Sequence, residues 1–274
     1  MRDARIVAET DDFAVVFKPP RMHCAPNKHN NGDTLLDWYA AIFPHVMNLT
    51  GKKKGEGGLL HRLDYETHGL VLFAKNQHSL DNLLEQQDAG NFIKEYSAVC
   101  IKSGIGDQGS GIRDRSLINN GTSGLSPGCS NTNPRSPVPD PRSPIPIESY
   151  FRPFGPGRKQ VRAVTELNSK GKETATDKGG YYRTEIVSME KLDDYPENSY
   201  HLTLRLKRGF RHQIRCHLAW IGCPVLNDPL YGSAPCEGFL ALRAHGLFFT
   251  DPKSSIPAEC IIEPLPAEGF CFIL

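Results

Sequence analysis

The chain has 274 residues, of which 39% are hydrophobic and 23% are charged, values typical of a soluble globular protein. This length allows a buried core in one domain, with or without an insertion. Basic and acidic residues nearly balance, and the formal net charge is +1. The composition therefore excludes a globally basic nucleic-acid-binding protein, and any surface that binds a polyanion must be a local patch.

The first twenty residues mix charges with short apolar runs, a pattern that excludes both a signal peptide and a membrane span. The cysteines are scattered without a Cys-x-x-Cys pair, which favours reduced thiols over disulfides. Cys216 lies between His212 and His217, but this spacing matches no zinc template. We expect a cytoplasmic protein with no metal ion, no cofactor and no membrane contact.

In chain order, the first predicted elements are two strands and a helix. Residues 6–8 and 13–17 predict short strands, and Pro19 and Pro20 end the second because proline cannot continue a ladder. Apolar residues then predict a helix over about 34–43.

The run His61-Arg62-Leu63-Asp64-Tyr65-Glu66-Thr67-His68-Gly69 follows, and it leads directly into apolar residues 70–74, which predict a buried strand. A carboxylate on a loop that a strand holds in place suits a nucleophile, and Arg62 is near enough in sequence to favour ionised Asp64. The alternative is a structural loop with a surface ion pair. The spacing alone favours this alternative, because Arg-x-Asp is common.

An amphipathic helix over 77–89 and an alternating strand over 93–100 come next. Tyr96 lies on this strand, where a tyrosine is usually a packing residue. Residues 105–147 contain no aromatic residue, and Gly, Ser, Pro and Asn make up more than half of them. Such a segment cannot bury enough surface to offset its ordering entropy, so we predict a disordered insertion in a single domain, 1–274.

Residues 147–162 interleave cations with aromatic side chains, a composition suited to phosphate contact beside base stacking or to a plain basic surface loop. Paired strands over 181–192 and 200–207 follow. A helix is then predicted over about 211–221. Arg211 and Arg215 would lie at i and i+4 on it and could face one cleft.

Three motifs in this order resemble those of the RluA-type pseudouridine synthases. Residues 61–75, His-Arg-Leu-Asp-x-x-Thr-x-Gly-Leu-x-Leu-x-Ala-Lys, resemble the family's active-site motif. Lys94-Glu95-Tyr96-x-Ala resembles the second motif. Gly209-Phe210-Arg211-His212-Gln213-Ile214-Arg215, running on to Asp228-Pro229-Leu230-Tyr231-Gly232, resembles the third, and residues 242–252 resemble the closing strand.

The resemblance implies that Asp64 is the nucleophile, that Tyr96 stacks on the uracil ring and that Arg215 pairs with Asp64. We expect Arg62 to help take the uridine out of its stack by holding the RNA backbone or the vacated space. From the basic composition and the resemblance together, we predict RNA contacts by Arg152, Arg158, Lys159, Arg162, Arg208, Arg211, His212 and Gln213.

The resemblance also implies an α+β fold, with a mixed, mostly antiparallel central sheet flanked by helices and an active-site cleft across the sheet. The expected activity is that of an isomerase that converts specific uridines of ribosomal or transfer RNA to pseudouridine. We expect a monomer that needs no cofactor. The Asp64 motif begins too early for a separate RNA-binding module ahead of it.

Two alternatives stay open. The chain departs from the family at His68, where a small serine is usual, and at Phe210, where an arginine is common, so a catalytically silent RNA-binding relative is possible. The retained active-site residues argue against it. A glycosidase would need a second acidic residue at a fixed separation from Asp64, and only Glu66 is near in sequence.

Overall fold

The computed structural model describes residues 3–27, 32–102, 144–164, 180–193, 195, 197–232 and 238–265. Nearly all of the predicted insertion lies outside these residues. Its end is an exception, because a strand begins at Ile145 and pairs with the strand that contains Tyr182. Any insertion therefore ends before Ile145, rather than at residue 147 as we predicted.

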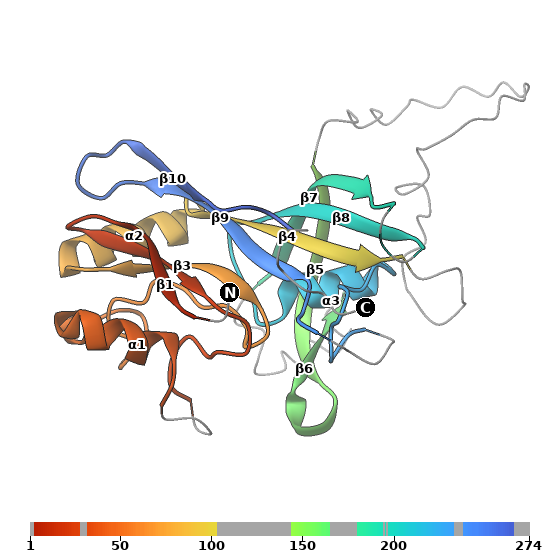
Figure 1. The fold of residues 1–274 in the computed structure, drawn as a ribbon, viewed down its shortest axis with the longest axis horizontal. Coiled ribbons are helices and arrows are strands. Elements are labelled where there is room, and N and C mark those ends of the chain that lie inside the picture. The colour runs from red at the N-terminus through yellow and green to blue at the C-terminus, as the bar shows by residue number, and fades with distance from the viewer. Residues whose placement is uncertain are drawn as a thin grey trace, which may run out of the picture.

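The described strands form one sheet. They are β1 (Arg5–Glu9), β2 (Phe13–Lys18), β3 (His68–Ala74), β4 (Ile93–Ile101), β5 (Ile145–Phe154), β6 (Gln160–Val164), β7 (Tyr182–Lys191), β8 (Ser199–Leu206), β9 (Leu242–Thr250) and β10 (Pro257–Ile261). Their order is β1-β2-β3-β9-β4-β8-β7-β5-β6, and β10 pairs with β9 (Figure 1). Among these strands only β3 and β9 pair in parallel, so the sheet is mixed and mostly antiparallel, as predicted.

Two helices flank one end of the sheet (Figure 1). Thr34 caps α1 (Leu35–Ile42) through a capping box, and the side chain of Asn76 caps α2 (Gln77–Ala89). A left-handed glycine, Gly90, ends α2. Both helices confirm the predicted ranges to within one residue at each end.

The third helix, α3 (Gln213–Trp220), begins two residues later than predicted. His212 adopts a left-handed conformation, with φ of 57°, and the first helical side chain accepts a hydrogen bond from the main-chain N–H of Phe210. Arg211 therefore precedes the helix, and the helical relation that we predicted was wrong, although Arg211 and Arg215 do line one cavity. In the described part of the chain, no helix is long and apolar enough to cross a membrane.

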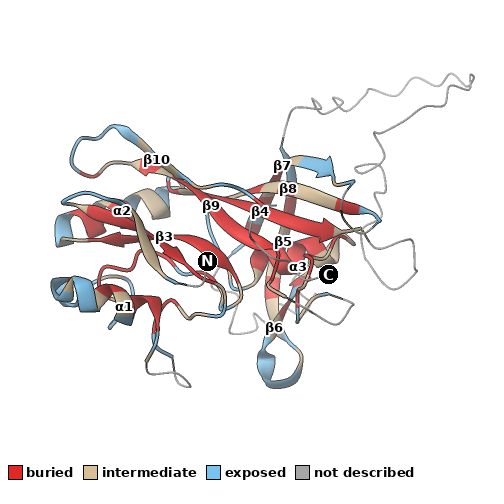
Figure 2. Ribbon diagram, viewed as in Figure 1, coloured by how far each residue is buried: buried red, intermediate tan, exposed pale blue. Residues whose placement is uncertain are grey.

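Part of the sheet is buried on both faces, since β2 and β3 are buried along their whole length (Figure 2). Val16 and Val15 point to opposite faces, into separate hydrophobic clusters. Tyr39 of α1 and Ile214 of α3 pack in the first cluster, whereas Leu80 of α2 packs in the second. The described cysteines are free thiols, and all but the last are buried: Cys24, Cys100, Cys216, Cys223 and Cys260.

Candidate active site

Asp64 lies on the irregular segment that leads into β3. Leu60 and Leu72 are joined by a main-chain hydrogen bond of 3.0 Å, and Nε2 of His61 accepts from the Leu72 N–H at 3.3 Å. The carbonyl of Asp64 accepts from the N–H of Thr67 at 3.2 Å. A buried strand thus holds the loop, as the sequence predicted, while the Asp64 side chain stays 22% exposed.

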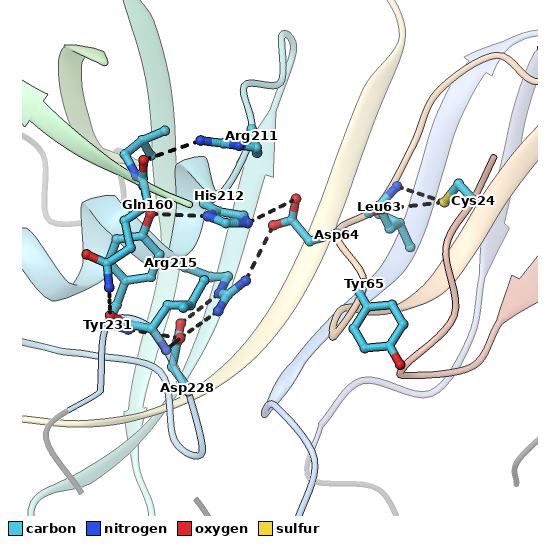
Figure 3. Close-up of polar contacts among 12 residues, drawn as sticks. Cys24, Leu63, Asp64, Tyr65, Gln160, Arg211, His212, Arg215, Asp228 and Tyr231 are labelled. Atoms are coloured by element: carbon cyan, nitrogen blue, oxygen red, sulfur yellow. Dashed lines mark hydrogen bonds and ion pairs between the residues drawn. The ribbon is translucent and has the colours of Figure 1, made fainter. Parts of the chain in front are cut away.

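A thiol fixes the residue just before Asp64. Sγ of Cys24 accepts a hydrogen bond from the N–H of Leu63 at 3.1 Å and donates to its carbonyl at 3.5 Å (Figure 3). Burial raises the pKa of the Cys24 thiol, so the proton that it donates is retained. We did not predict this contact, because it joins segments that are 39 residues apart.

Arg215 approaches Asp64 from α3. Its buried guanidinium donates to both carboxylate oxygens of Asp228, from Nη2 to Oδ1 at 2.6 Å and from Nε to Oδ2 at 2.7 Å. Its Nη1 lies 3.9 Å from Oδ2 of Asp64 (Figure 3). Burial alone would lower the pKa of Arg215, but the hydrogen bonds and the charge of Asp228 outweigh it and raise this pKa. Asp228, which we did not predict, therefore fixes a permanently charged arginine beside Asp64.

His212 also faces Asp64. Its Nε2 lies 4.0 Å from Oδ1 of Asp64, and its Nδ1 lies 3.2 Å from the hydroxyl of Tyr231 (Figure 3). That hydroxyl also accepts the N–H of Val161 at 2.8 Å. Burial lowers the pKa of His212 despite the nearby carboxylate. His212 therefore lies beside Asp64 in the site, and its RNA contact stays a prediction.

A cavity of about 920 Å³ opens over Asp64. Tyr96 of β4 and Arg215 line it, so the predicted catalytic side chains meet in one place. Burial, reinforced by the charge of Asp64, raises the pKa of Tyr96, and its ring is neutral. The cations that line this cavity are Lys52, Lys53, Arg62, Lys94, Lys207, Arg208, Arg211 and Arg215. No group of three or more His, Cys, Asp or Glu side chains within the described ranges could hold a metal ion.

Arg62 does not contact Asp64 in this structure. Its side chain is 49% exposed, and Nη1 lies 3.2 Å from Oε1 of Glu56. The sequence analysis expected Arg62 to favour the ionised form of Asp64. In the structure Arg215, and not Arg62, lies beside Asp64, and Arg62 lies at the mouth of the cavity.

Four of the predicted RNA contacts lie on the β5–β6 hairpin. Arg158 and Lys159 are exposed at its turn. Arg162 is exposed on β6, with its guanidinium 5.7 Å from the ring of Phe154, and Arg152 is half-buried on β5. None of these four lines the cavity, so they form a separate basic surface beside it.

The remaining predicted contacts lie around α3. Arg208 is exposed and stacks 5.0 Å from the ring of Tyr182, and Arg211 is exposed and donates to the carbonyl of Arg158 at 2.8 Å. Gln213 is 2% exposed and donates to a main-chain carbonyl of β7 at 2.9 Å. Gln213 therefore holds the turn before α3 in place, and it also lines the cavity, so its RNA contact stays a prediction.

Both departures from the family pattern are packing residues. Phe210 stacks on Phe151, with ring centroids 5.1 Å apart and an interplanar angle of 7°. His68 is buried at the parallel β3–β9 pair, and its Nε2 accepts from Nε of Arg243 at 3.1 Å. Burial, together with the charge of Arg243, holds the pKa of His68 well below its usual range. Neither side chain occupies the place of Asp64, which lies on the segment that leads into β3.

A family model described as RNA pseudouridylate synthase matches residues 12–220, which include the Asp64 loop, β4 and α3. The chain belongs to the RNA pseudouridylate synthase family. Ribosomal large subunit pseudouridine synthase D of Haemophilus ducreyi is 28% identical over 96% of this chain and 67% of its own length. The Haemophilus influenzae protein of the same name is 27% identical over 84% of this chain. The match covers 53% of that relative, so the chain spans about half the length of several curated family members.

Solved structures confirm the fold of this pseudouridylate synthase family member. Human RNA pseudouridylate synthase domain containing 1 superposes with a TM-score of 0.60 at 18% identity, over 96% of this chain and 84% of that one. Human RNA pseudouridylate synthase domain containing 4 gives a TM-score of 0.56 at 14% identity, over 94% and 88% of the two chains. The predicted α+β architecture is thus shared with known structures of the family.

Proposed function

We propose that the chain is an RNA pseudouridine synthase in which Asp64 is the nucleophile. The observation that carries this proposal is the meeting of Asp64, Tyr96 and Arg215 in one cavity of about 920 Å³, with Nη1 of Arg215 at 3.9 Å from the carboxylate. A cavity of this size accommodates a nucleotide taken out of its stack.

Each side chain supplies one requirement of the isomerisation. The reaction breaks the bond from C1′ of the ribose to N1 of the uracil, rotates the base and forms a bond from C1′ to C5. C5 then loses its proton, and N1 takes up a proton in its place. Asp64 is the carboxylate that attacks, and Arg215 aligns it. Tyr96 provides a flat neutral surface for the ring. The atoms balance without an oxidant, a reductant or a group donor.

The substrate that we propose is structured RNA, with ribosomal RNA ahead of transfer RNA. Two supports are the names of the Haemophilus relatives, which refer to the large ribosomal subunit, and the basic surface beside the cavity. Arg62 and Arg211, at the mouth, would hold the strand that enters. The cytoplasmic location, the monomeric state and the single-domain organisation stay predictions.

Incubation with uridine-containing transcripts, followed by nucleoside analysis, tests the function. We expect pseudouridine in a large-subunit ribosomal RNA transcript, and mapping of the modified positions would identify the uridine. RNA binding with no pseudouridine in ribosomal or transfer RNA would instead support the catalytically silent relative.

Replacing Cys24 with alanine should slow the reaction without weakening RNA binding. The N–H and carbonyl of Leu63 lose their partner, so we expect a loss of about 1 kcal/mol in the free energy of unfolding and a several-fold lower single-turnover rate. Cys223→Ala is the matched control, since Cys223 is equally buried and away from the cavity. Equal rates for the two variants would contradict a positioning role for Cys24.

Replacing Arg158 and Lys159 with alanine should weaken RNA binding and leave the rate at saturating RNA unchanged. Both cations lie on the hairpin, outside the cavity. For each phosphate that the protein no longer neutralises, the slope of log affinity against log salt should fall by about 1. Lys253→Ala, at an exposed turn between β9 and β10, serves as the control in a filter-binding salt series. An unchanged slope would place the RNA elsewhere.

A further inference from the structure

Lys94 lies on the same face of β4 as Tyr96. Glu95, between them, points to the opposite face, where it contacts Arg205 at 2.6 Å and His245 at 3.1 Å. Lys94 and Tyr96 both line the cavity, and their positions are about 7 Å apart along the strand. Lys94 and the surface proposed for the uracil therefore belong to the same wall of the cavity.

This ammonium has no counter-ion within the described ranges. Lys94 is only 5% exposed, yet its side chain makes no hydrogen bond or ion pair with any residue that the structure describes. Its neighbour in the cavity wall, His61, cannot accept its proton, because Nε2 of His61 already accepts from the N–H of Leu72. Nδ1 of the neutral His61 ring is a second buried donor without a partner among the described residues. Two hydrogen-bond donors in this cavity wall, Nζ of Lys94 and Nδ1 of His61, therefore have no acceptor among the described residues.

Lys18 shows that the fold can satisfy a buried lysine when its role is structural. It is completely buried, and its Nζ donates to the carbonyls of Pro19, Met22 and Tyr65 at 2.8, 2.9 and 3.3 Å. Burial lowers the pKa of each of the two lysines to about 8. Unlike Lys18, Lys94 makes no hydrogen bond to a described residue that would offset the cost of its burial. This arrangement is the one expected of a buried cation that binds a ligand.

We propose that Lys94 forms a phosphate-binding site inside the cavity, which takes a backbone phosphate next to the uridine under reaction. This inference rests on the proposed function, since it names how the same cavity holds its RNA.

A phosphate fits this site better than a neutral carbonyl of the base. An almost fully buried cation is stabilised most by an anion that enters with the substrate, and a uracil oxygen offers only a partial charge. A methyl group at Gly209 would lie 3.5 Å from Nζ of Lys94, so Nζ sits directly beside the basic loop of Lys207 and Arg208. An RNA backbone that follows this loop passes within reach of the ammonium.

The first test compares two buried lysines by thermal unfolding of the free protein. Lys94→Met should raise the melting temperature, because it removes a buried charge that has no partner among the described residues. Lys18→Met should lower it, because three carbonyls lose their donor. A fall in the melting temperature of Lys94→Met, or a failure to fold, would show that Lys94 is structural and would overturn the proposal.

The second test compares uridine with uridine 5′-monophosphate and uridine 3′-monophosphate as ligands. At least one monophosphate should raise the melting temperature of wild type more than uridine does, and Lys94→Met should abolish that difference while it keeps the response to uridine. An equal response of wild type to all three ligands would overturn the phosphate site. Equal loss for uridine and the monophosphates would mean that Lys94 holds the nucleoside instead.

The pH dependence has a defined sign. With a pKa of about 8, Lys94 is charged at pH 7, so the preference for the monophosphate should be full there and should fall as the pH rises through 8. Other titratable groups line the same cavity, among them His61, Tyr96, Asp64, Asp88, Lys207 and Arg208. Lys94→Met retains all of them, so the difference between the two proteins isolates Lys94. A preference that is constant from pH 7 to about 10 would contradict the role of its charge.

None of these measurements requires turnover. If wild type makes no pseudouridine but shows the Lys94-dependent preference, the proposed reaction fails and the phosphate site stands. If wild type makes pseudouridine and Lys94→Met keeps the preference, the phosphate site fails and the reaction stands.

Discussion

Asp64→Asn should abolish pseudouridine formation and leave the fold and the RNA affinity close to those of wild type. The amide is nearly isosteric with the carboxylate but is not a nucleophile, so we expect the single-turnover rate to fall by at least about a thousandfold. The Asp64 carbonyl, which holds the turn to Thr67, is unchanged by the substitution. Nucleoside analysis of a transcript that wild type modifies measures the rate, and filter binding measures the affinity.

Glu66→Gln is the matched control for this experiment. Glu66 lies two residues further along the same loop, outside the cavity, and its carboxylate is 3.5 Å from Nε of the exposed Arg21. Removing its charge should leave the rate near that of wild type. A rate for Asp64→Asn within tenfold of wild type would remove Asp64 from the mechanism, and an equal fall in both variants would point to a general effect on the loop.

The elements of this fold could be predicted because their signals are local. Alternation and apolar runs mark β3 and β8, and the cap at Thr34 and the glycine at Gly90 mark helix ends. The start of α3 could not be predicted in the same way. Its position depends on the left-handed conformation of His212, and nothing in the local pattern requires that conformation of a histidine.

The candidate site was predicted only in part, because its contacts join distant segments. Proximity in sequence favoured Arg62 as the partner of Asp64, yet Arg62 turns outward to Glu56. Arg215, far away in sequence, takes the place beside the carboxylate. Asp228 lies in the third motif, and this was the one available signal for its role. The family resemblance implied the pairing of Arg215 with Asp64, whereas residue spacing alone could not, because the two side chains meet only in the folded chain.

Asp228→Asn should destabilise the protein and also slow the reaction. The substitution leaves the guanidinium of Arg215, 2% exposed, without its counter-ion, and we expect a loss of about 3 kcal/mol in the free energy of unfolding. Oδ1 of Asp228 also accepts from the main-chain N–H groups of Leu230 and Tyr231, so the turn that carries Tyr231 should loosen. Denaturant unfolding measures the first effect and single-turnover kinetics the second. Glu56→Gln, which breaks the exposed pair with Arg62, is the control and should change stability by less than about 1 kcal/mol.

A double variant separates the two effects of Asp228. In Asp228→Asn with Arg215→Met, no uncompensated charge remains buried at this pair, so part of the stability lost in Asp228→Asn should return. The rate should stay low, because Asp64 then has no arginine at 3.9 Å to align it. If the rate recovered together with the stability, Arg215 would be a structural residue, and the alignment of Asp64 would depend on another group. If neither recovered, Asp228 would stabilise the turn at Tyr231 independently of Arg215.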